Sequence, residues 1–281
     1  MIYHSLSSKE HRVFEKLNHE EHLNEYPFYK ELGIDLEEYG KIDRKIEKDI
    51  YSTVDQDNKT PFPVELDDLT RLHFLVLSRK VTTILEFGVG KSTLVFNDAL
   101  KLNKQKHEKY IKDNLRRSNL FECHSVDNNN EWLEEVKKEF GNLEHVNLHY
   151  SPLEVSTFNS RVCTFYSDMP NISPDLIYLD APDQFSATGN ERGISTAHSD
   201  RMPMSADILA FEHFLTPGTL IVVDGRTANA RFLKANFQRN WSHHHSVEHD
   251  QHFFELREQP LGKYNLSQIE YCLGKDWLED L

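Results

Sequence analysis

The chain has 281 residues, of which 38% are hydrophobic and 28% charged, and its formal net charge at pH 7 is −14. This length allows one large domain or one domain with an appendage. The negative charge disfavours nucleic acid and anionic membranes as partners, because both would repel an acidic surface. No apolar run approaches the ~20 residues that span a bilayer.

The cysteines and the N-terminus indicate a compartment. Cys123, Cys163 and Cys272 are scattered without the paired spacing of a metal site, which is typical of reduced thiols. The first residues lack the apolar core of a signal peptide. We therefore expect a cytoplasmic protein.

The first 62 residues are polar and rich in charge, with apolar residues at roughly helical spacing. Aromatic side chains such as Tyr26 and Phe28 need a surface to cover. Two prolines, Pro61 and Pro63, then interrupt regular structure. We expect a helical extension or cap over residues 1–62, followed by one domain over residues 63–281. The sequence leaves open whether the extension covers a pocket or a second copy of the chain in a homo-oligomer.

After the prolines, short apolar strands alternate with amphipathic helices. Strands are expected at residues 82–87, 120–126, 146–150, 176–179, 219–223, 242–249 and 251–257. Helices are expected at residues 64–80, 92–102, 131–140, 207–215 and 230–240. The basic stretch 103–119 is an extension or an insertion. This order predicts an α/β fold, doubly wound around a mostly parallel seven-stranded sheet.

One turn is the most informative segment of the chain. The apolar run 82–85 ends at Glu86, passes Gly88 and Gly90, and enters a helix. Glycine has no Cβ, so the backbone can approach a ligand closely. The first N–H groups of a helix have no partner within it and can face polar ligand atoms. The turn predicts the floor of a nucleotide-type pocket.

Three kinds of nucleotide compete for this turn. A P-loop needs a glycine at position 85, which is Leu, and a dinucleotide fingerprint needs a third glycine at position 93, which is Thr. A carboxylate at Glu86 repels a pyrophosphate but suits the ammonium of S-adenosylmethionine, met directly or through water. A buried strand followed by an ordinary glycine turn is the remaining alternative.

Acids stand at four predicted strand ends, namely Glu86, Asp127, Asp180 and Asp224. Ligands of open parallel sheets bind outside the carboxyl ends of the strands. Asp127 follows the neighbouring strand and is placed to accept both hydroxyls of a ribose. The alternative for Asp127 is a cap of the helix at residues 131–140.

The motifs EFGVGKST, SVDNNNEWLEEV, LIYLDAPD and IVVDGR, in this order, resemble those of class I S-adenosylmethionine-dependent methyltransferases over residues 64–257. They are similar in particular to small-molecule or sugar O-methyltransferases encoded with surface-polysaccharide genes. The resemblance implies a Rossmann-like sheet that ends in an antiparallel strand pair, with S-adenosylmethionine as cofactor. The cofactor-binding residues that it implies are Glu86, Phe87, Gly88, Gly90, Ser92, Thr93, Asp127 and Asp180.

We expect catalysis from Asp180, Asp224 and His198. Methyl transfer is largely a matter of positioning, and an alcohol acceptor also benefits from a base. His198 in the long loop 184–203 is the preferred base, and Asp183 competes with it. A divalent cation held by Asp180 and Asp224, with Asn229 nearby, is possible but not favoured, because the family's acid–acid–Asn arrangement is not fully matched.

Two further groups of side chains have alternative interpretations. Arg192, Arg201 and Arg226 could bind an anionic group on the acceptor, or form surface ion pairs. The histidines at 243–245, with His249 and His252, suggest a metal site, but adjacent strand residues point to opposite faces, which favours a solvated strand.

The resulting prediction is O-methylation of a small hydroxylated acceptor such as a sugar. The alternatives are an N-methyltransferase of a small molecule and a non-catalytic binding or scaffold protein that keeps the fold. A nucleic-acid methyltransferase is disfavoured by the charge, and because Asp180-Ala181-Pro182-Asp183 replaces the Asn-Pro-Pro-Tyr-like motif of such enzymes.

Overall fold

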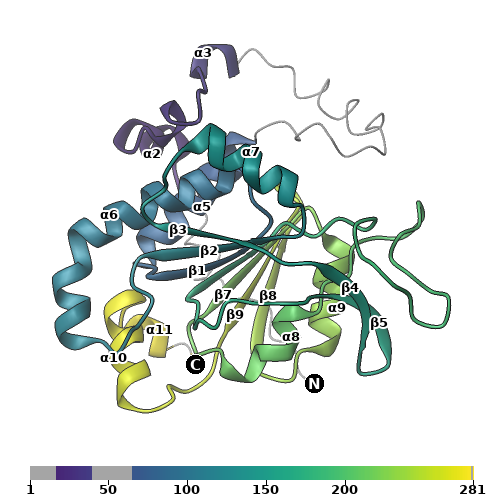
Figure 1. Cartoon of the computed structure of the whole chain (residues 1–281). Helices are drawn as coiled ribbons and strands as arrows, with labels where there is room; N and C mark the ends of the chain where they lie inside the picture. The colour runs from purple at the N-terminus through teal and green to yellow at the C-terminus, as the bar shows by residue number, and fades with distance from the viewer. Residues whose placement is uncertain (1–16, 40–64, 280) are drawn as a thin grey trace.

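The structure of the chain is a computed structural model that describes residues 17–39, 65–279 and 281. Its centre is a seven-stranded sheet with the order β3-β2-β1-β6-β7-β9-β8 (Figure 1). The strands are β1 (Thr83–Phe87), β2 (Glu122–Asp127), β3 (Val146–Tyr150), β6 (Leu176–Leu179), β7 (Leu220–Asp224), β8 (Trp241–Ser246) and β9 (Gln251–Leu256). Five neighbouring strands run parallel, namely β3, β2, β1, β6 and β7. Strand β9 is antiparallel to both of its neighbours, β7 and β8. The predicted fold class is confirmed.

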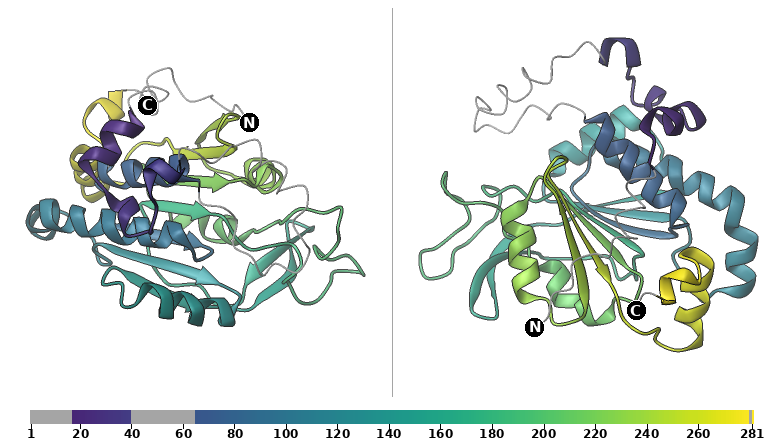
Figure 2. Two further views of the ribbon diagram at one scale, coloured as in Figure 1. Left: turned by 90° about the horizontal axis from the view of Figure 1, so that it is seen from above. Right: turned by 180° about the vertical axis from the view of Figure 1, so that it is seen from behind.

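Helices cover both faces of the sheet (Figures 1 and 2). They are α5 (Leu66–Ser78), α6 (Lys91–Asn114), α7 (Asn130–Phe140), α8 (Asp207–Phe211) with the short η2 (Glu212–Phe214), α9 (Thr227–Asn236), α10 (Lys263–Cys272) and α11 (Asp276–Glu279). The basic stretch after residue 103 is an extension, because α6 continues through it to Asn114. Among the helices that the structure describes, none combines the length and apolar character needed to cross a bilayer.

The central strand β1 shows why an apolar run becomes a buried strand here. All five of its residues are buried. Ile84 packs into the core formed with α5 and α6, whereas Leu85 and Phe87 pack into the core formed with α8 and α9. Successive side chains of a strand point to opposite faces, so a strand between two helical layers must be apolar on both.

A two-stranded hairpin between β3 and β6 was not predicted. It consists of β4 (Leu153–Phe158) and β5 (Arg161–Tyr166), paired antiparallel. The turn residues Asn159 and Ser160 both have positive φ, which suits the right-handed twist of a two-residue hairpin turn. The alternating pattern of the two strands was a usable signal.

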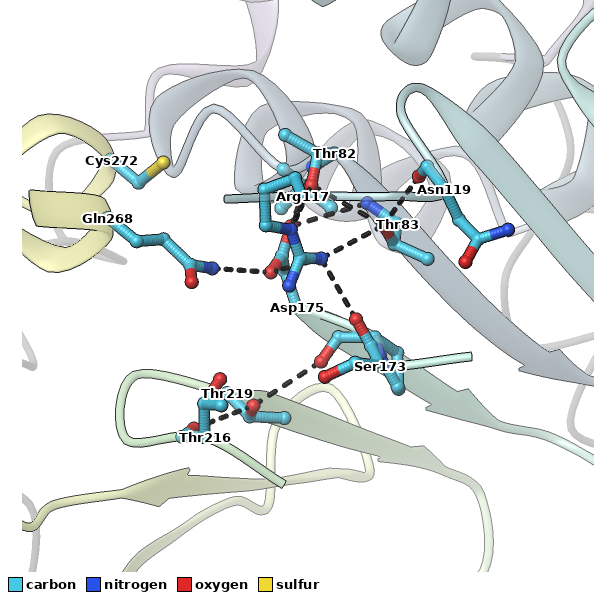
Figure 3. A network of polar contacts seen from close by, with 12 residues as sticks. Thr82, Thr83, Arg117, Asn119, Ser173, Asp175, Thr216, Thr219, Gln268 and Cys272 are labelled. Atoms are coloured by element: carbon cyan, nitrogen blue, oxygen red, sulfur yellow. Dashed lines mark hydrogen bonds and ion pairs between the residues drawn. The ribbon is translucent and has the colours of Figure 1, made fainter. Parts of the chain in front are cut away.

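A polar network around Asp175 lies at the edge of the sheet where the parallel strands begin (Figure 3). Its carboxylate accepts hydrogen bonds from the Thr82 hydroxyl at 2.6 Å and from Gln268 of α10 at 2.7 Å, and it pairs with Arg117 at 2.8 Å. Arg117 also donates to the Thr83 hydroxyl. These contacts fix α10, which was not predicted, and the segment that follows α6 to the start of β1.

Part of the predicted extension packs against the domain. It contains α2 (His19–Glu25), η1 (Phe28–Lys30) and α3 (Leu36–Tyr39). Phe28 and Leu32 are buried in the core beside α5, and His22 contacts His73 of α5 at 2.8 Å. Residues 1–16 and 40–64 of the extension lie outside the described residues, so the division of the chain at residue 62 stays a prediction.

Candidate functional site

The strand register brings three predicted acids into one row. Phe87 at the end of β1 is paired with Val126 of β2 and Leu179 of β6. Leu179 is in turn paired with Val223 of β7, so these residues form one row across the sheet. Asp127, Asp180 and Asp224 each follow one of these residues in the chain, at the carboxyl ends of β2, β6 and β7. We call these three residues the carboxyl-edge acids. As the sequence predicted, they lie at the edge where parallel sheets bind ligands.

The two glycines of the turn after β1 have different surroundings. Gly88 has a φ of +95°, and a Cβ on it would lie 2.9 Å from the Cβ of Ala181, which follows β6. Gly90 has an extended backbone with φ of −172°, and no atom lies within 4 Å of the Cβ position. Gly88 is therefore needed for packing, and Gly90 is the glycine with room above its backbone for a ligand.

Glu86 is completely buried, with 0% of its surface exposed. Its carboxylate accepts hydrogen bonds from the hydroxyls of Ser125 at 2.5 Å, Thr93 at 2.8 Å and Ser92 at 2.5 Å. Burial raises the pKa of Glu86 to about 7, although these hydroxyls lower it. The sequence predicted that Glu86 faces the ligand, but in the structure its carboxylate is bound by hydroxyls of the protein. In this structure Ser92 and Thr93 both donate to Glu86, and these hydrogen bonds hold the turn.

The remaining residues of the turn are placed as follows. The Phe87 side chain is buried in the core formed with α8 and α9, so it does not face a ligand. The Phe87 carbonyl accepts the Asp180 N–H at 3.1 Å. Lys91 pairs with Glu139 at 2.9 Å on the surface.

Asp127 is buried and joins two turns of the site. Its carboxylate accepts the Val89 N–H at 3.2 Å and the Asn129 N–H at 2.8 Å. Burial raises the pKa of Asp127, and the backbone donors lower it. The cap of α7 is Asn129, whose side chain accepts the Trp132 N–H, so the helix-cap alternative for Asp127 is wrong.

Asp180 and Asp224 differ in exposure. The side chain of Asp180 is 55% exposed. Asp224 accepts the Tyr178 hydroxyl at 2.5 Å, and burial raises the pKa of the Asp224 carboxyl. The Tyr178 contact was missed from the sequence, although Tyr178 lies on β6 two residues before Asp180. A base or ligand contact at this edge is most accessible at Asp180.

Of the two alternatives for Arg226, its contacts agree with an ion pair within the protein. Its guanidinium donates to the backbone carbonyls of Asp180 and Pro182, and its Nε lies 3.7 Å from the Asp180 carboxylate. Arg226 therefore anchors the loop after β6 instead of extending toward an anionic substrate. Arg201 likewise donates to the Ser195 carbonyl of its own loop, while Arg192 is exposed.

The candidate cation site also changes. The side-chain amide of Asn229 is buried and exchanges two hydrogen bonds of 2.9 Å with the backbone of Ser205. Asn229 is therefore not available as a third oxygen ligand beside Asp180 and Asp224. Within residues 17–39 and 65–281, position 280 excepted, no group of three or more His, Cys, Asp or Glu side chains is arranged to hold a metal ion.

The two candidate bases lie in the loop after β6. His198 is half exposed, accepts the Asp200 N–H at 3.1 Å through Nδ1, and lies 3.9 Å from the Asp200 carboxylate. Asp183 accepts the N–H groups of Phe185 and Ser186. The contacts of His198 thus lie within its own loop, and its role as a base stays a prediction.

The histidines of β8 and β9 separate as the strand period predicts. His243 contacts His252 at 3.0 Å, whereas His244 stacks on Phe253 on the opposite face. His243 also contacts Lys234 of α9 at 3.0 Å, so it is packed against a helix and not solvated as expected. Burial lowers the pKa of His243 to about 3 and that of His252 to about 4.

No protein-family model matches the sequence, and no curated protein matches it either. Among solved structures, the chain is similar to an O-methyltransferase from Bacillus cereus in complex with SAH, with 12% identity and a TM-score of 0.38 over 75% of this chain and 89% of that one. It is similar to the O-methyltransferase TomG from Streptomyces achromogenes in complex with SAM, with 14% identity and a TM-score of 0.36 over 75% and 95%. A third is the N-methyltransferase NodS from Bradyrhizobium japonicum, with 16% identity and a TM-score of 0.33 over 76% and 98%.

A polar chain behind Asp224 was missed from the sequence. Arg71 of α5 donates to Gln251 at the start of β9 at 3.0 Å and to Asp68 at 2.7 Å. Gln251 is paired with Asp224 in the strand register. Arg71 and Gln251 are 180 positions apart, so only the fold brings them together. These hydrogen-bonded side chains link α5 to the carboxyl edge of the sheet.

Proposed function

We propose that the chain is an S-adenosylmethionine-dependent methyltransferase that methylates an oxygen of a small hydroxylated acceptor such as a sugar. The observation that carries the proposal is the link between the glycine turn and Asp127. The Val89 N–H, between the two glycines, donates to the Asp127 carboxylate at 3.2 Å. A backbone that can approach a ligand and an acid that can accept ribose hydroxyls therefore meet at one point.

The residues at this point suit the cofactor. Gly90 leaves room above the backbone, and the first N–H groups of α6 begin directly after it. Each Asp127 oxygen accepts one backbone N–H, and a carboxylate oxygen can accept two hydrogen bonds. Asp127 thus keeps acceptor capacity for a ribose. When bound, S-adenosylmethionine supplies an activated methyl group on its sulfonium.

The other carboxyl-edge acids would serve the acceptor. Asp180 is exposed beside the turn, and Arg226 fixes the loop that carries it. Asp224, at the end of the neighbouring strand β7, accepts a hydrogen bond from the Tyr178 hydroxyl of β6. A hydroxyl that donates to Asp180 is oriented by it, and its proton can pass to a base. His198 and Asp183 are the two candidates for that base.

The charge at this edge bears on the acceptor. Three acids follow neighbouring strands, and the guanidinium of Arg226 is bound to backbone carbonyls. An anionic sugar phosphate or uronate would be repelled by these carboxylates. We therefore favour a neutral polyhydroxylated acceptor, whose hydroxyls can donate to carboxylates. The cytoplasm is the proposed compartment, supported by three cysteines that are buried as free thiols.

The test is product analysis. The protein is incubated with methyl-deuterated S-adenosylmethionine and a panel of neutral sugars, small amines and, for comparison, anionic nucleotide sugars, followed by mass spectrometry. We expect deuterated methyl on the oxygen of a hydroxylated acceptor. Transfer to amines alone would favour the N-methyltransferase alternative. Cofactor binding without any transfer would favour the binding or scaffold protein.

A further inference from the structure

Strand β3 forms one edge of the seven-stranded sheet and has β2 as its only neighbour among the described strands (Figure 1). In a parallel pair, alternate residues of a strand bond to the neighbouring strand. His145 and Ser151 bond to β2 at the two ends of β3, so Val146, Leu148 and Tyr150 direct their N–H and C=O groups away from β2. Among the described residues these outward groups make a single backbone hydrogen bond, a long one of 3.3 Å from the Val146 N–H.

The edge of β3 lacks the usual protection against a further strand. An exposed strand edge is a template for pairing with another chain, and proteins block such edges with charged side chains, prolines or bulges. Strand β3 has the sequence VNLHY, without lysine, acid or proline. Its pairing with β2 is continuous over all five residues, so no bulge interrupts it. The edge can therefore accept another strand along its whole length.

A groove lies beside β3 on the face of the sheet that α7 covers. It has a volume of about 420 Å³, and its apolar lining includes Val136 and Phe140 of α7 and Val146 and Leu148 of β3. Tyr150 lies on the same face of β3 as Val146, because it is four residues further along the strand, and it is 52% exposed. An open apolar groove and an exposed aromatic ring thus lie at the two ends of one strand.

We propose that β3 pairs with β3 of a second copy of this chain, antiparallel about a twofold axis at Leu148. Val146 of one copy then lies opposite Tyr150 of the other, and the outward backbone groups of both strands become paired. Opposite residues of an antiparallel pair share a face, so the ring of Tyr150 enters the groove beside Val146 of the second copy. The twofold axis repeats this contact, which makes the surface self-complementary.

The charges of α7 fit the same arrangement. Its N-terminal half carries Glu131 and Glu134, and its last turn carries Lys137 and Lys138. The twofold axis places the two α7 helices antiparallel on one face of the joined sheet, with the acids of one copy toward the lysines of the other. Glu134 and Lys137 are 53% and 50% exposed, so both can reach a second copy. This attraction opposes the repulsion between two chains of net charge −14.

The proposed dimer keeps both candidate functional sites open. Because the two β3 strands run antiparallel, the carboxyl edges of the two sheets face opposite directions. The interface uses the outer side of β3, whereas the carboxyl-edge acids follow β2, β6 and β7. The dimer therefore does not depend on the proposed function.

The test is the mass of the full-length protein in solution, measured by light scattering and sedimentation equilibrium. For the wild type we expect twice the 33.0 kDa of one chain. Tyr150→Lys should raise the dimer dissociation constant at least about tenfold, because it buries an ammonium group in the apolar groove. Tyr264→Lys is the matched control, since Tyr264 lies on α10 and is 51% exposed, and it should keep the wild-type mass.

A cysteine variant locates the twofold axis independently. Opposite Cα atoms of a hydrogen-bonded antiparallel pair are about 5.5 Å apart, which a disulfide can span. Oxidised Leu148→Cys should therefore form a covalent dimer, whereas Tyr264→Cys should not, and the three native cysteines are buried. Melting temperatures establish that each variant is folded. A wild type with the mass of one chain overturns the inference, as does a dimer that Tyr150→Lys leaves intact or that Leu148→Cys does not cross-link.

Discussion

The Thr93 hydroxyl lies 2.8 Å from the Glu86 carboxylate. The same hydroxyl accepts the Gly90 N–H at 3.1 Å, so one side chain connects the end of β1, the turn and the start of α6. The turn is therefore held in shape by its own residues. A loop that is ordered before a ligand arrives loses less conformational freedom on binding.

Glu86 should make stability depend on pH in a particular direction. The pKa of Glu86 is raised from 4.5 to about 7 in the folded chain. Between these values the folded state binds more protons than the unfolded state, so the free energy of unfolding falls as pH rises through this window. The fall amounts to about 3 kcal/mol at most and ends above pH 7.

The measurement is chemical denaturation of the wild type and Glu86→Gln at several pH values from 4.5 to 8. The difference between the two free energies of unfolding isolates Glu86 from the other titrating groups. It should fall by the stated amount as pH rises. A difference that is constant over this range contradicts a protonated, hydroxyl-bound Glu86.

The two glycines should respond differently to substitution. Gly88→Ala should lower the free energy of unfolding by about 1–3 kcal/mol, because φ is positive and Ala181 is in the way. Gly90→Ser should change it by less than about 0.5 kcal/mol, since Ser is favoured at the start of a helix. It should nevertheless weaken S-adenosylhomocysteine binding, because the new Cβ occupies the space above the backbone. Wild-type affinity in a stable Gly90→Ser protein would show that no ligand approaches there.

The network at the amino-terminal edge should matter for stability alone. Asp175→Ala leaves the guanidinium of Arg117, which is 7% exposed, without its carboxylate. We expect the free energy of unfolding to fall by about 3–5 kcal/mol, as for other broken buried ion pairs. The exposed pair Glu134–Lys137 provides the control, and Glu134→Gln should cost less than about 1 kcal/mol. Ligand affinity of the folded protein should be the same in both variants, because Asp175 lies at the end of the sheet opposite the site.

Acid should release the N-terminal segment. Asp98 can only accept, so His73 donates to it through Nε2, and His73 Nδ1 accepts from His22. Burial lowers the pKa of His22 from 6.5 to about 4, so its contribution is complete above pH 6.5 and is lost as pH falls toward 4. The loss is about 3 kcal/mol at most. The hydrogen-exchange protection factors of residues 17–39, which are corrected for the intrinsic pH dependence of exchange, should fall as pH is lowered through this window. His22→Phe should remove that fall.

The sequence predicted the parts of the fold that depend on local patterns. Residues 176–179 were predicted with the bounds of β6, because a short apolar run between turn residues is typical of a buried strand. Residues 146–150 were predicted with the bounds of β3, an edge strand in which Val146 and Leu148 alternate with polar residues. The hairpin β4–β5 was missed, although Asn159 and Ser160 form a turn between alternating segments.

The partners of polar side chains could not be read from the chain. Ser125 donates to Glu86 across 39 positions, and Arg226 donates to the Asp180 carbonyl across 46. The sequence therefore suggested that Glu86, the acid before the glycine turn, contacts a ligand. In the folded chain its carboxylate instead accepts hydrogen bonds from three hydroxyls. The position of Asp127 was easier to predict, since it depends only on strand order.

The most direct test of the account is calorimetric titration of S-adenosylmethionine into the wild type, Asp127→Asn and the exposed control Asp200→Asn. We expect the wild type and Asp200→Asn to bind alike, and Asp127→Asn about 10–100-fold more weakly, because a carboxylate that accepts two ribose hydroxyls makes strong hydrogen bonds. The melting temperatures of all three proteins establish that they are folded. Binding in Asp127→Asn equal to that of the wild type, or a folded wild type that does not bind S-adenosylmethionine, would contradict the account.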